Sequence, residues 1–211
     1  AYVNDRGIYQ HQIEPTNLAT GAIVIIILCV VGLAAWLLAH DYRFALDELA
    51  RENDRVRTAK NHIEHMALHD ALTGLPNRLL AQNNFETIYQ YAKTHQQQLG
   101  IIFIDLDNLK PINDSLGHQA GDQILKEVAL RLLSYTRKVD HVCRFGGDEF
   151  IVFMPNLQSE EDASKASLEI LQLVSENYLY RNIEIFCTCS IGIALAPQDG
   201  EDLDTLIKNA D

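Results

Sequence analysis

Three acidic residues beside strand-like segments carry the clearest chemical signal in this chain. Asp105 ends the apolar run 99–104, and Asp148 and Glu149 follow the glycine pair at 146–147. Carboxylate oxygens are hard ligands suited to Mg²⁺, which usually keeps waters and takes further ligands from phosphate. Three clustered carboxylates repel one another without a cation. The set therefore predicts a magnesium site that faces a phosphate-bearing ligand.

Gly146 and Gly147 predict a tight turn between two strands, and they leave room for phosphates to approach the backbone. A lone Gly-Gly-Asp is more often an ordinary hairpin turn, so its meaning depends on the residues around it. The elements that must position these residues follow from hydrophobic periodicity and turn signals. Helices are expected over 77–95, 108–115, 119–136 and 160–177 and from 202, and strands over 99–104, 142–145 and 149–153 and within 183–195.

The motifs around the turn resemble the GGDEF family of diguanylate cyclases. They are IDLDNLKPINDSLGHQAGD at 104–122, RFGGDEF at 144–150, DALTGLPNR from Asp70, SIGIA at 190–194 and the closing Asn-Ala-Asp. Their order and spacing match the family from Asp70 to the end of the chain. The resemblance implies an α/β fold of the α+β palm-like kind, with a nucleotide-cyclase-type, antiparallel-containing sheet flanked by helices.

The resemblance also implies an activity, in which two GTP molecules condense into cyclic di-GMP and two pyrophosphates where two domains face each other. It implies a homodimer through this domain and the preceding helix, with two Mg²⁺ or Mn²⁺ ions in each active site. The corresponding metal ligands are Asp105, the Leu106 carbonyl, Asp148 and Glu149. Asp148, Glu149 and Lys110 are the implied catalytic residues, with Asp148 as proton acceptor and Lys110 beside the phosphates.

The implied substrate-binding residues are Asn113, His118, Asp122, Gly146 and Gly147. A carboxylate such as Asp122 can accept from guanine N1–H and the 2-amino group together, a pairing that adenine cannot offer. Asp107 and Asp114 are expected to have structural roles instead, such as capping and turn hydrogen bonds.

Arg137 and Asp140 form an R-x-x-D motif shortly before the glycine pair. This offset resembles the family's inhibitory product site, where the arginine would bind phosphate or guanine of cyclic di-GMP. A surface ion pair is the alternative interpretation.

The composition limits the range of partners and metal sites. The formal net charge of −12 sets the average field against polyanions, so no nucleic acid partner is expected. Cys187 and Cys189 stand two residues apart, but packed thiols are favoured over a zinc site because no second pair stands at zinc-site spacing. His62, His65 and His69 are likewise expected to be solvated or packed.

An uncharged segment at 18–39 predicts a membrane-spanning helix, since it would be roughly 33 Å long. A buried core helix is the alternative. Arg6 alone precedes the segment, whereas five basic residues follow it between 43 and 60. By the positive-inside rule, 1–17 is extracytoplasmic and the domain lies in the cytoplasm, at a bacterial inner membrane.

Residues 40–69 predict a signalling helix, because apolar residues recur every seven positions at Tyr42, Leu49, Val56 and Ile63. The pattern favours a parallel two-helix coil over a single solvated helix, although Glu52 interrupts the seam. Residues 70–211 are expected to be a C-terminally truncated GGDEF domain, since family members continue with a phosphate-binding Lys and Arg. The motif forms also resemble hybrids in which an EAL phosphodiesterase follows. A GGDEF module that binds GTP or cyclic di-GMP without turnover, and regulates that phosphodiesterase, is therefore the alternative function.

Overall fold

The computed structural model describes residues 15–211, with side chains described from residue 20 onward. The expected extracytoplasmic segment 1–17 therefore lies outside the described residues, apart from its helical end. The described chain divides into a helical unit that ends at Asn61 and a compact unit from His62 to Asp211.

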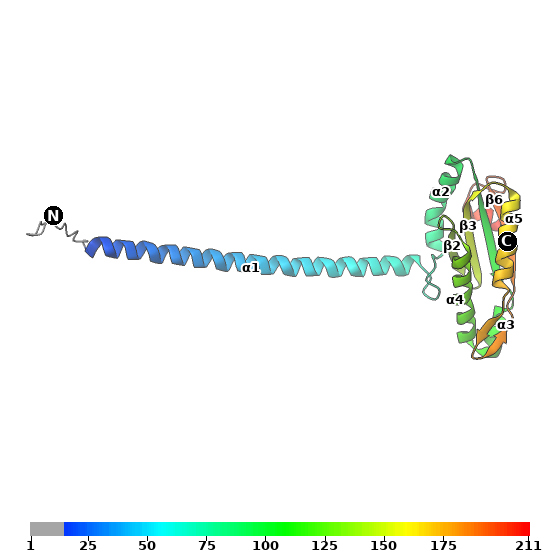
Figure 1. The fold of residues 1–211 in the computed structure, drawn as a ribbon, viewed down its shortest axis with the longest axis horizontal. Coiled ribbons are helices and arrows are strands. Elements are labelled where there is room, and N and C mark those ends of the chain that lie inside the picture. The colour runs from blue at the N-terminus through cyan, green and yellow to red at the C-terminus, as the bar shows by residue number, and fades with distance from the viewer. Residues whose placement is uncertain (1–14) are drawn as a thin grey trace, which may run out of the picture. The chain divides into compact units, whose positions relative to one another are not determined.

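The first helix, α1 (Pro15–Leu68), is continuous through both the apolar segment and the polar segment that follows it (Figure 1). The sequence predicts these as two functional segments, and no break separates them because 40–69 contain neither Gly nor Pro. By length and composition alone, α1 is apolar enough to cross a membrane, with a mean hydropathy of 3.0 in its most apolar window. None of that window is buried within the protein.

The compact unit contains a four-stranded antiparallel sheet in the order β2-β3-β1-β6. Its strands are β1 (Gln98–Leu106), β2 (His141–Gly146), β3 (Glu149–Leu157) and β6 (Cys189–Ala196). β1 is buried over nearly all of its length, as the apolar run predicts. The palm-like α/β architecture expected from the sequence is confirmed.

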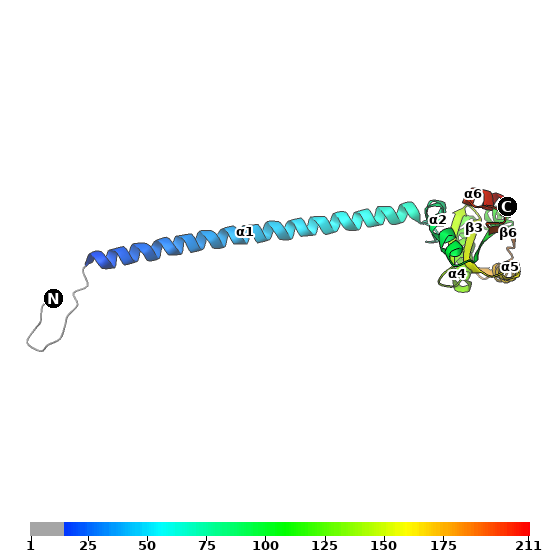
Figure 2. The same cartoon turned by 90° about the horizontal axis from the view of Figure 1, so that it is seen from above.

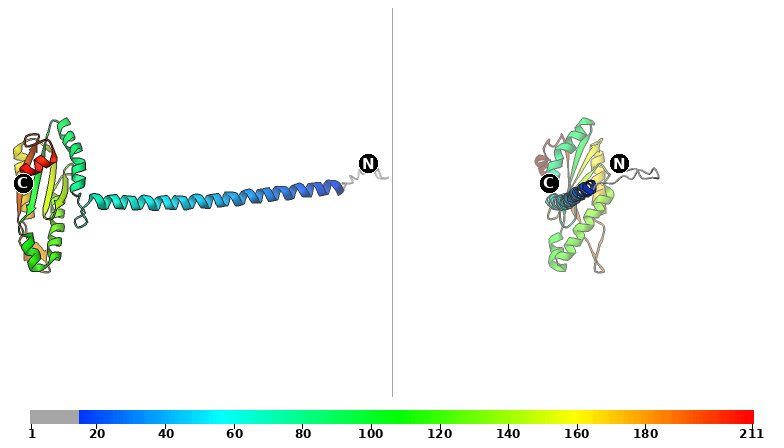
Figure 3. Two further views of the ribbon diagram at one scale, coloured as in Figure 1. Left: turned by 180° about the vertical axis from the view of Figure 1, so that it is seen from behind. Right: turned by 90° about the vertical axis from the view of Figure 1, so that its left-hand side faces the viewer.

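Helices cover both faces of this sheet (Figure 2). They are α2 (Arg78–Thr94), α4 (His118–Tyr135), α5 (Glu160–Val174) and α6 (Leu203–Ala210), whereas α3 (Leu109–Leu116) contacts α4. α2 and α6 pack on one face, where α6 crosses the strands (Figure 3), and α4 and α5 pack on the other. Each predicted helix forms within one residue of its expected bounds, except that α5 ends earlier than expected.

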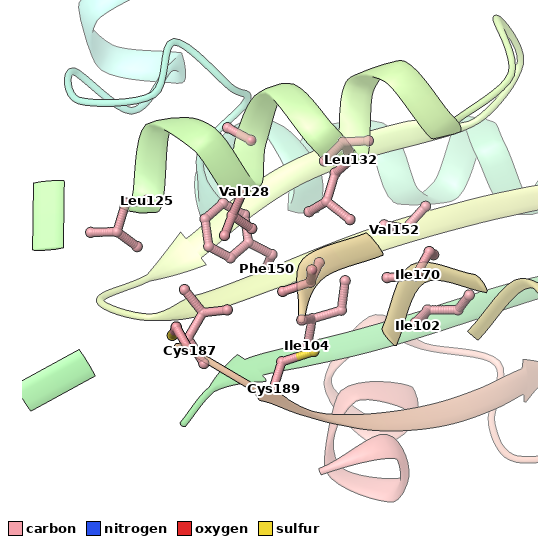
Figure 4. Close-up of a cluster of buried hydrophobic side chains, with 14 of the residues drawn as sticks. Ile102, Ile104, Leu125, Val128, Leu132, Phe150, Val152, Ile170, Cys187 and Cys189 are labelled. Carbon is pink, nitrogen blue, oxygen red and sulfur yellow. The ribbon is translucent and has the colours of Figure 1, made fainter. Parts of the chain in front are cut away.

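The larger core lies between the sheet and the α4/α5 layer (Figure 4). Leu125, Val128 and Leu132 recur at helical spacing on α4 and face the buried side chains of Ile104 and Phe150. Burial of each such side chain stabilises the fold by about 1.5–3 kcal/mol. This core holds β1 and β3 in a fixed register, which is what positions the acidic residues at their ends.

The prediction of a helix through residue 177 is wrong, because α5 ends at Val174 and a short strand, β4 (Tyr178–Tyr180), follows. β4 pairs with β5 (Ile183–Ile185) in a separate hairpin. The guanidinium of Arg131 on α4 donates to the carbonyls of Leu173, Val174, Glu176 and Asn177. These carbonyls are therefore satisfied by a side chain distant in sequence rather than by further helical turns.

Arg131→Met is expected to destabilise the protein by about 2–3 kcal/mol, because the variant leaves two part-buried carbonyls and two exposed ones without this donor. The Arg131 side chain is only 12% exposed, and its guanidinium lies 4.1 Å above the Tyr178 ring. Met preserves the aliphatic volume, so the loss reports the contacts of the guanidinium, which include an ion pair with Glu127 at 3.4 Å. Chemical denaturation measures it, with exposed Lys126→Met on the same helix as the control. An equal, small change in both variants would contradict this role for Arg131.

Candidate active site

Strand register brings two of the predicted metal ligands together. In the antiparallel ladder Asp105 on β1 lies directly opposite Glu149 on β3, and the Leu106 N–H donates to the Asp148 carbonyl at 3.2 Å. Residues directly opposite in a ladder project from the same face of the sheet. Asp105 lies two residues after Phe103 on β1, so its side chain projects from the same face of the sheet, the one covered by α2 and α6. The carboxylates of Asp105 and Glu149 therefore both lie on this face, and Asp148 lies in the adjoining turn.

The carboxylates at this sheet edge repel one another. Burial, followed by the charges of Asp148, Asp107 and Asp211, raises the pKa of Asp105. The pKa of Glu149 is also raised, by burial and then by Asp105, Asp148 and Asp211, and Arg78 opposes this rise. A divalent cation would relieve the repulsion, so the residues present fit such an ion.

The protein groups do not form a complete cage for a metal. In the part of the chain that the structure describes, no three His, Cys, Asp or Glu side chains are grouped so that they could hold a metal ion by themselves. Mg²⁺ commonly retains waters and takes phosphate oxygens as ligands, and it is seldom enclosed by protein side chains alone. The chemistry of the donor set therefore fits an ion that binds together with a nucleotide.

Asp107 has the structural role that the sequence predicts. Its carboxylate accepts from the Thr188 hydroxyl at 2.7 Å and the Ser190 hydroxyl at 3.0 Å, and its N–H donates to the Thr188 carbonyl. These bonds attach the end of β1 to β6. The Asp107 carboxylate therefore has a structural role, although Asp107 directly follows Leu106, whose carbonyl is a predicted metal ligand.

Only one of the two glycines in the turn uses a left-handed backbone. Gly147 has φ of +39°, whereas a Cβ on Gly146 would meet nothing nearer than the Glu149 carboxylate at 3.6 Å. The Gly147 carbonyl accepts from the Arg144 side chain at 2.6 and 3.1 Å. The turn is thus held in shape by the strand residue that precedes it.

Sequence reasoning missed the partner of Arg144, which also donates to the Asp70 carboxylate at 2.8 Å. Asp70 in turn accepts from the backbone and hydroxyl of Thr73. Burial pulls the pKa of Asp70 upward, but the hydrogen bonds from Thr73 and Arg144 outweigh it and hold the pKa below its usual value. The motif that begins at Asp70 is therefore fastened to the glycine turn. Asp70 and Arg144 each begin a motif that is visible in the sequence, but nothing in the sequence indicates that the two side chains form an ion pair.

Asp70→Asn is expected to destabilise the protein at neutral pH by about 1–3 kcal/mol, because it weakens a part-buried ion pair that positions the turn. The pKa of Asp70 is lower in the folded protein than in the unfolded chain, where it is near 3.8. The ionised carboxylate therefore stabilises the folded state above that unfolded pKa, and this stabilisation is lost as the pH falls through the folded pKa. The free energies of unfolding of wild type and variant should therefore converge in acid. Denaturation at pH 7 and pH 3 measures this. A pH-independent difference would contradict it.

The predicted guanine-binding residues come from α3 and the start of α4. Gly117, with φ of +88°, separates the two helices, and His118 and Asp122 lie one turn apart at the exposed start of α4. The Asn113 side-chain oxygen is buried and has no hydrogen-bond partner. A Cβ on Gly121 would collide with this amide, so the glycine leaves the space that Asn113 occupies. Gly121 was not among the predicted site residues.

The residues before α3 include the predicted phosphate-side lysine. Lys110 is exposed in the first turn of α3. The residue before the helix, Asn108, has φ of +61° and makes no side-chain capping bond. The first N–H groups of α3 are therefore not capped by the Asn108 side chain.

Arg137 and Asp140 bind each other. The guanidinium donates to both carboxylate oxygens at 2.9 and 3.0 Å, and the Arg137 backbone N–H adds a third bond at 2.8 Å. Both residues line a cavity of about 410 Å³ together with Tyr135 and Lys165. A ligand phosphate at this place would have to compete with the Asp140 carboxylate for Arg137.

Four of the other residues considered as metal ligands, Cys187, Cys189, His65 and His69, make packing contacts. Cys187 and Cys189 are buried, and the Cys187 thiol donates to the Asp107 carbonyl at 3.3 Å, so packed thiols are confirmed. Burial raises the pKa of Cys187 to about 11. The rings of His65 and His69 stack with centroids 4.0 Å apart.

Comparisons with known proteins agree with this geometry. Residues 67–211 match the family model described as "Diguanylate cyclase, GGDEF domain". The chain is 36% identical over 175 residues to diguanylate cyclase TpbB of Pseudomonas aeruginosa, covering 82% of this chain and 40% of that protein. It is 39% identical over 166 residues to the cyclic di-GMP phosphodiesterase NbdA of the same species, covering 75% of this chain and 21% of that protein.

The fold also matches solved structures. The coiled coil and GGDEF domain of DgcB from Caulobacter crescentus, solved with c-di-GMP, superposes with a TM-score of 0.70 at 25% identity, covering 79% of this chain and 88% of that chain. Together with the family model, the strand-end carboxylates and the glycine turn lead to one assignment. This chain, which spans between a fifth and two fifths of the length of these curated relatives, belongs to the GGDEF family of diguanylate cyclase domains.

Proposed function

We propose that this chain is a diguanylate cyclase that condenses two GTP into cyclic di-GMP and two pyrophosphates where two GGDEF domains face each other. The observation that carries the proposal is the register of Asp105 opposite Glu149, with Asp148 in the adjoining turn. Intact carboxylates at this edge provide the ligand set that the reaction needs. The relative TpbB, named a diguanylate cyclase, supports the same activity.

Two Mg²⁺ or Mn²⁺ ions would be held by Asp105, the Leu106 carbonyl, Asp148 and Glu149. Bound there, such ions neutralise phosphate charge and lower the pKa of the attacking hydroxyl. Asp148 accepts the proton from the 3′-hydroxyl of one GTP. Lys110 and the first N–H groups of α3 bind the terminal phosphates of the other.

Guanine binds between α3 and α4. Asp122 accepts from N1–H and the 2-amino group, the unpartnered oxygen of Asn113 accepts a further hydrogen bond, and His118 lines the same site. An unpartnered buried acceptor costs about 1–3 kcal/mol in the free protein. A ligand donor at Asn113 recovers that cost, which favours a base with an N–H group in this position. Gly146 and Gly147 let the phosphates approach the turn.

The chain is anchored by 18–39 in a bacterial inner membrane, with the GGDEF domain in the cytoplasm. The segment after it joins two copies as a parallel coil, and an upstream sensor controls how the two domains meet. The support is that Leu49, Val56 and Ile63 are each more than half exposed on α1, in heptad positions. A second α1 helix would cover them.

Product formation is limited by cyclic di-GMP bound at Arg137 and Asp140. The test is to incubate the full-length protein with Mg²⁺ and GTP and to quantify cyclic di-GMP by chromatography, for wild type and Arg137→Ala. Product from either protein supports the proposal, and more product from Arg137→Ala supports inhibition at this site. Absence of product from both would refute cyclase activity.

A second function is a regulatory module that binds GTP or cyclic di-GMP and controls a downstream EAL phosphodiesterase without turnover. It is favoured by the similarity to NbdA, which is named a phosphodiesterase and is about five times longer than the matched region. If GTP raises the phosphodiesterase rate, and Asp148→Asn leaves this response unchanged, the regulatory function is supported. Loss of the response in Asp148→Asn would favour the cyclase.

Mg²⁺ dependence provides a test of the metal ligands that does not require turnover. Without divalent ions, Asp105→Asn is expected to raise the melting temperature by a few degrees, because it removes one charge from the repelling set. Adding Mg²⁺ with GTP should stabilise the wild type and have little effect on the variant. Thermal denaturation measures both. A variant that responds to Mg²⁺ as the wild type does would exclude Asp105 as a ligand.

A further inference from the structure

A cavity of about 420 Å³ lies beside the glycine turn, and one of its lining residues, Arg78, has no role in the function proposed above. Its walls come from the start of α2, from Asp70 and from the end of β2 through Gly147. Two arginines line it, Arg78 and Arg144. The cavity therefore combines positive side chains with an exposed backbone turn, next to the carboxylates of the proposed active site.

The two arginines differ in the partners that their guanidinium groups already have. Arg144 forms an ion pair with Asp70 and donates twice to the Gly147 carbonyl, so its charge is paired and three of its N–H donors are used. Arg78 is the first residue of α2, it is exposed, and no carboxylate of the described chain is recorded within ion-pair distance of its guanidinium. Among the residues that line this cavity, Arg78 is the cation that forms no ion pair in the described part of the chain.

Arg78 is nevertheless held in place. Its guanidinium carbon lies 4.5 Å above the centroid of the Phe145 ring, in the residue directly before the glycine turn. Stacking on an aromatic face leaves the in-plane N–H donors of the guanidinium free to bind a ligand. Arg78 also shares the cavity with Gly146 and Gly147, the two residues directly before Asp148. The side chain is thus preorganised beside the site where the phosphates of a nucleotide are expected.

We propose that Arg78 binds a phosphate group of the guanosine nucleotide, in the cavity between the start of α2 and the Gly146–Gly147 turn. A guanidinium matches phosphate oxygens in a bidentate arrangement, and the glycines let the phosphate approach the backbone. The inference rests on the proposed cyclase function and adds a phosphate-binding residue to it. The group bound belongs to the triphosphate of GTP or to the pyrophosphate released from it.

Binding measurements on the full chain in detergent, with Mg²⁺, test the inference separately from turnover. The ligands are 3′-deoxy-GTP, which lacks the attacking hydroxyl, inorganic pyrophosphate and guanosine, each followed by calorimetry. Arg78→Gln is expected to weaken 3′-deoxy-GTP about tenfold, as for the loss of one charge-assisted contact, and to leave guanosine unchanged. A parallel loss for pyrophosphate assigns the contact to the leaving phosphates, and loss for 3′-deoxy-GTP alone assigns it to the α-phosphate.

Lys93→Gln is the matched control, because Lys93 lies at the opposite end of α2 and also stands over an aromatic ring, that of Tyr89 at 5.8 Å. It removes the same charge and should leave all three affinities unchanged. Arg78→Lys keeps the charge without the planar fork and should give an intermediate loss for 3′-deoxy-GTP. If Arg78→Gln fails to fold, Arg78→Lys alone decides.

Unchanged affinity of the Arg78 variants for 3′-deoxy-GTP would overturn the inference. So would an equal loss of guanosine binding, since that would indicate a general distortion of the site. If the wild type binds 3′-deoxy-GTP in an Arg78-dependent way but forms no cyclic di-GMP from GTP, the phosphate contact stands and the proposed turnover fails. If product forms while Arg78 has no effect on binding, the proposed function stands and this inference fails.

Discussion

Asp148→Asn is expected to lower the rate of cyclic di-GMP formation by a factor of about 10³ or more, since it removes the residue proposed as both a charged metal ligand and the proton acceptor. The fold should survive, because the bond from Leu106 to this residue uses the backbone carbonyl of position 148. Loss of one carboxylate also reduces the repulsion on Asp105 and Glu149. The variant should therefore be at least as stable as the wild type while it is inactive. Product chromatography at saturating GTP and thermal denaturation measure the two properties.

Asp114→Asn is the matched control for this substitution. Asp114 is exposed on α3, close in sequence to the proposed guanine residues, and the chemical change is the same. It should alter the rate by less than about threefold, as for a surface substitution outside the site. A variant at Asp148 that keeps more than a tenth of the wild-type rate would show that another group accepts the proton.

Gly121→Ala is expected to raise the KM for GTP by roughly ten- to a hundredfold, which corresponds to an overpacking cost of about 1–3 kcal/mol at the site. A Cβ at this position would collide with the side-chain amide of Asn113, which the glycine accommodates. Elsewhere in a helix the same change would stabilise the protein by about 1 kcal/mol, because Gly is a poor helix former. Activity and stability should therefore respond in opposite directions if Asn113 can move aside. Steady-state kinetics and denaturation measure both.

A double-mutant cycle shows whether the effect passes through Asn113. Asn113→Ala removes the amide that the new methyl group would strike. Gly121→Ala should therefore have little further effect on KM in the Asn113→Ala background. Exposed Lys126→Ala on α4 is the neutral control. Fully additive effects of the two substitutions would mean that Gly121 acts on GTP binding by some other route.

Much of the fold follows from local sequence. The unbroken apolar run before Asp105 predicts a strand buried on both faces, and β1 is such a strand. Gly-Gly between two strand-like segments predicts the β2–β3 hairpin, and the four-residue apolar periodicity of 119–136 predicts α4. These patterns are short-range, because backbone propensity and burial on one face act within a few residues.

The end of α5 shows where local reasoning stops. Nothing near residue 175 marks a helix end strongly, and the helix stops there while Arg131, more than forty residues earlier, satisfies the carbonyls that follow. Asp70 and Arg144 likewise belong to separate motifs that only the folded chain joins. Such pairs depend on side chains from distant elements, which no local pattern encodes.

The sequence by itself determined the family, the strand-end carboxylates and the glycine turn, because these are residue types at fixed spacing. The tertiary structure alone decided that Asp105 stands opposite Glu149, that Gly121 makes room for Asn113, and that Arg78 lies over Phe145. A shift of one residue in strand register would turn each of these carboxylates to the other face of the sheet. Register is set by the packing of whole helices on the sheet, so the site exists only once the domain has folded.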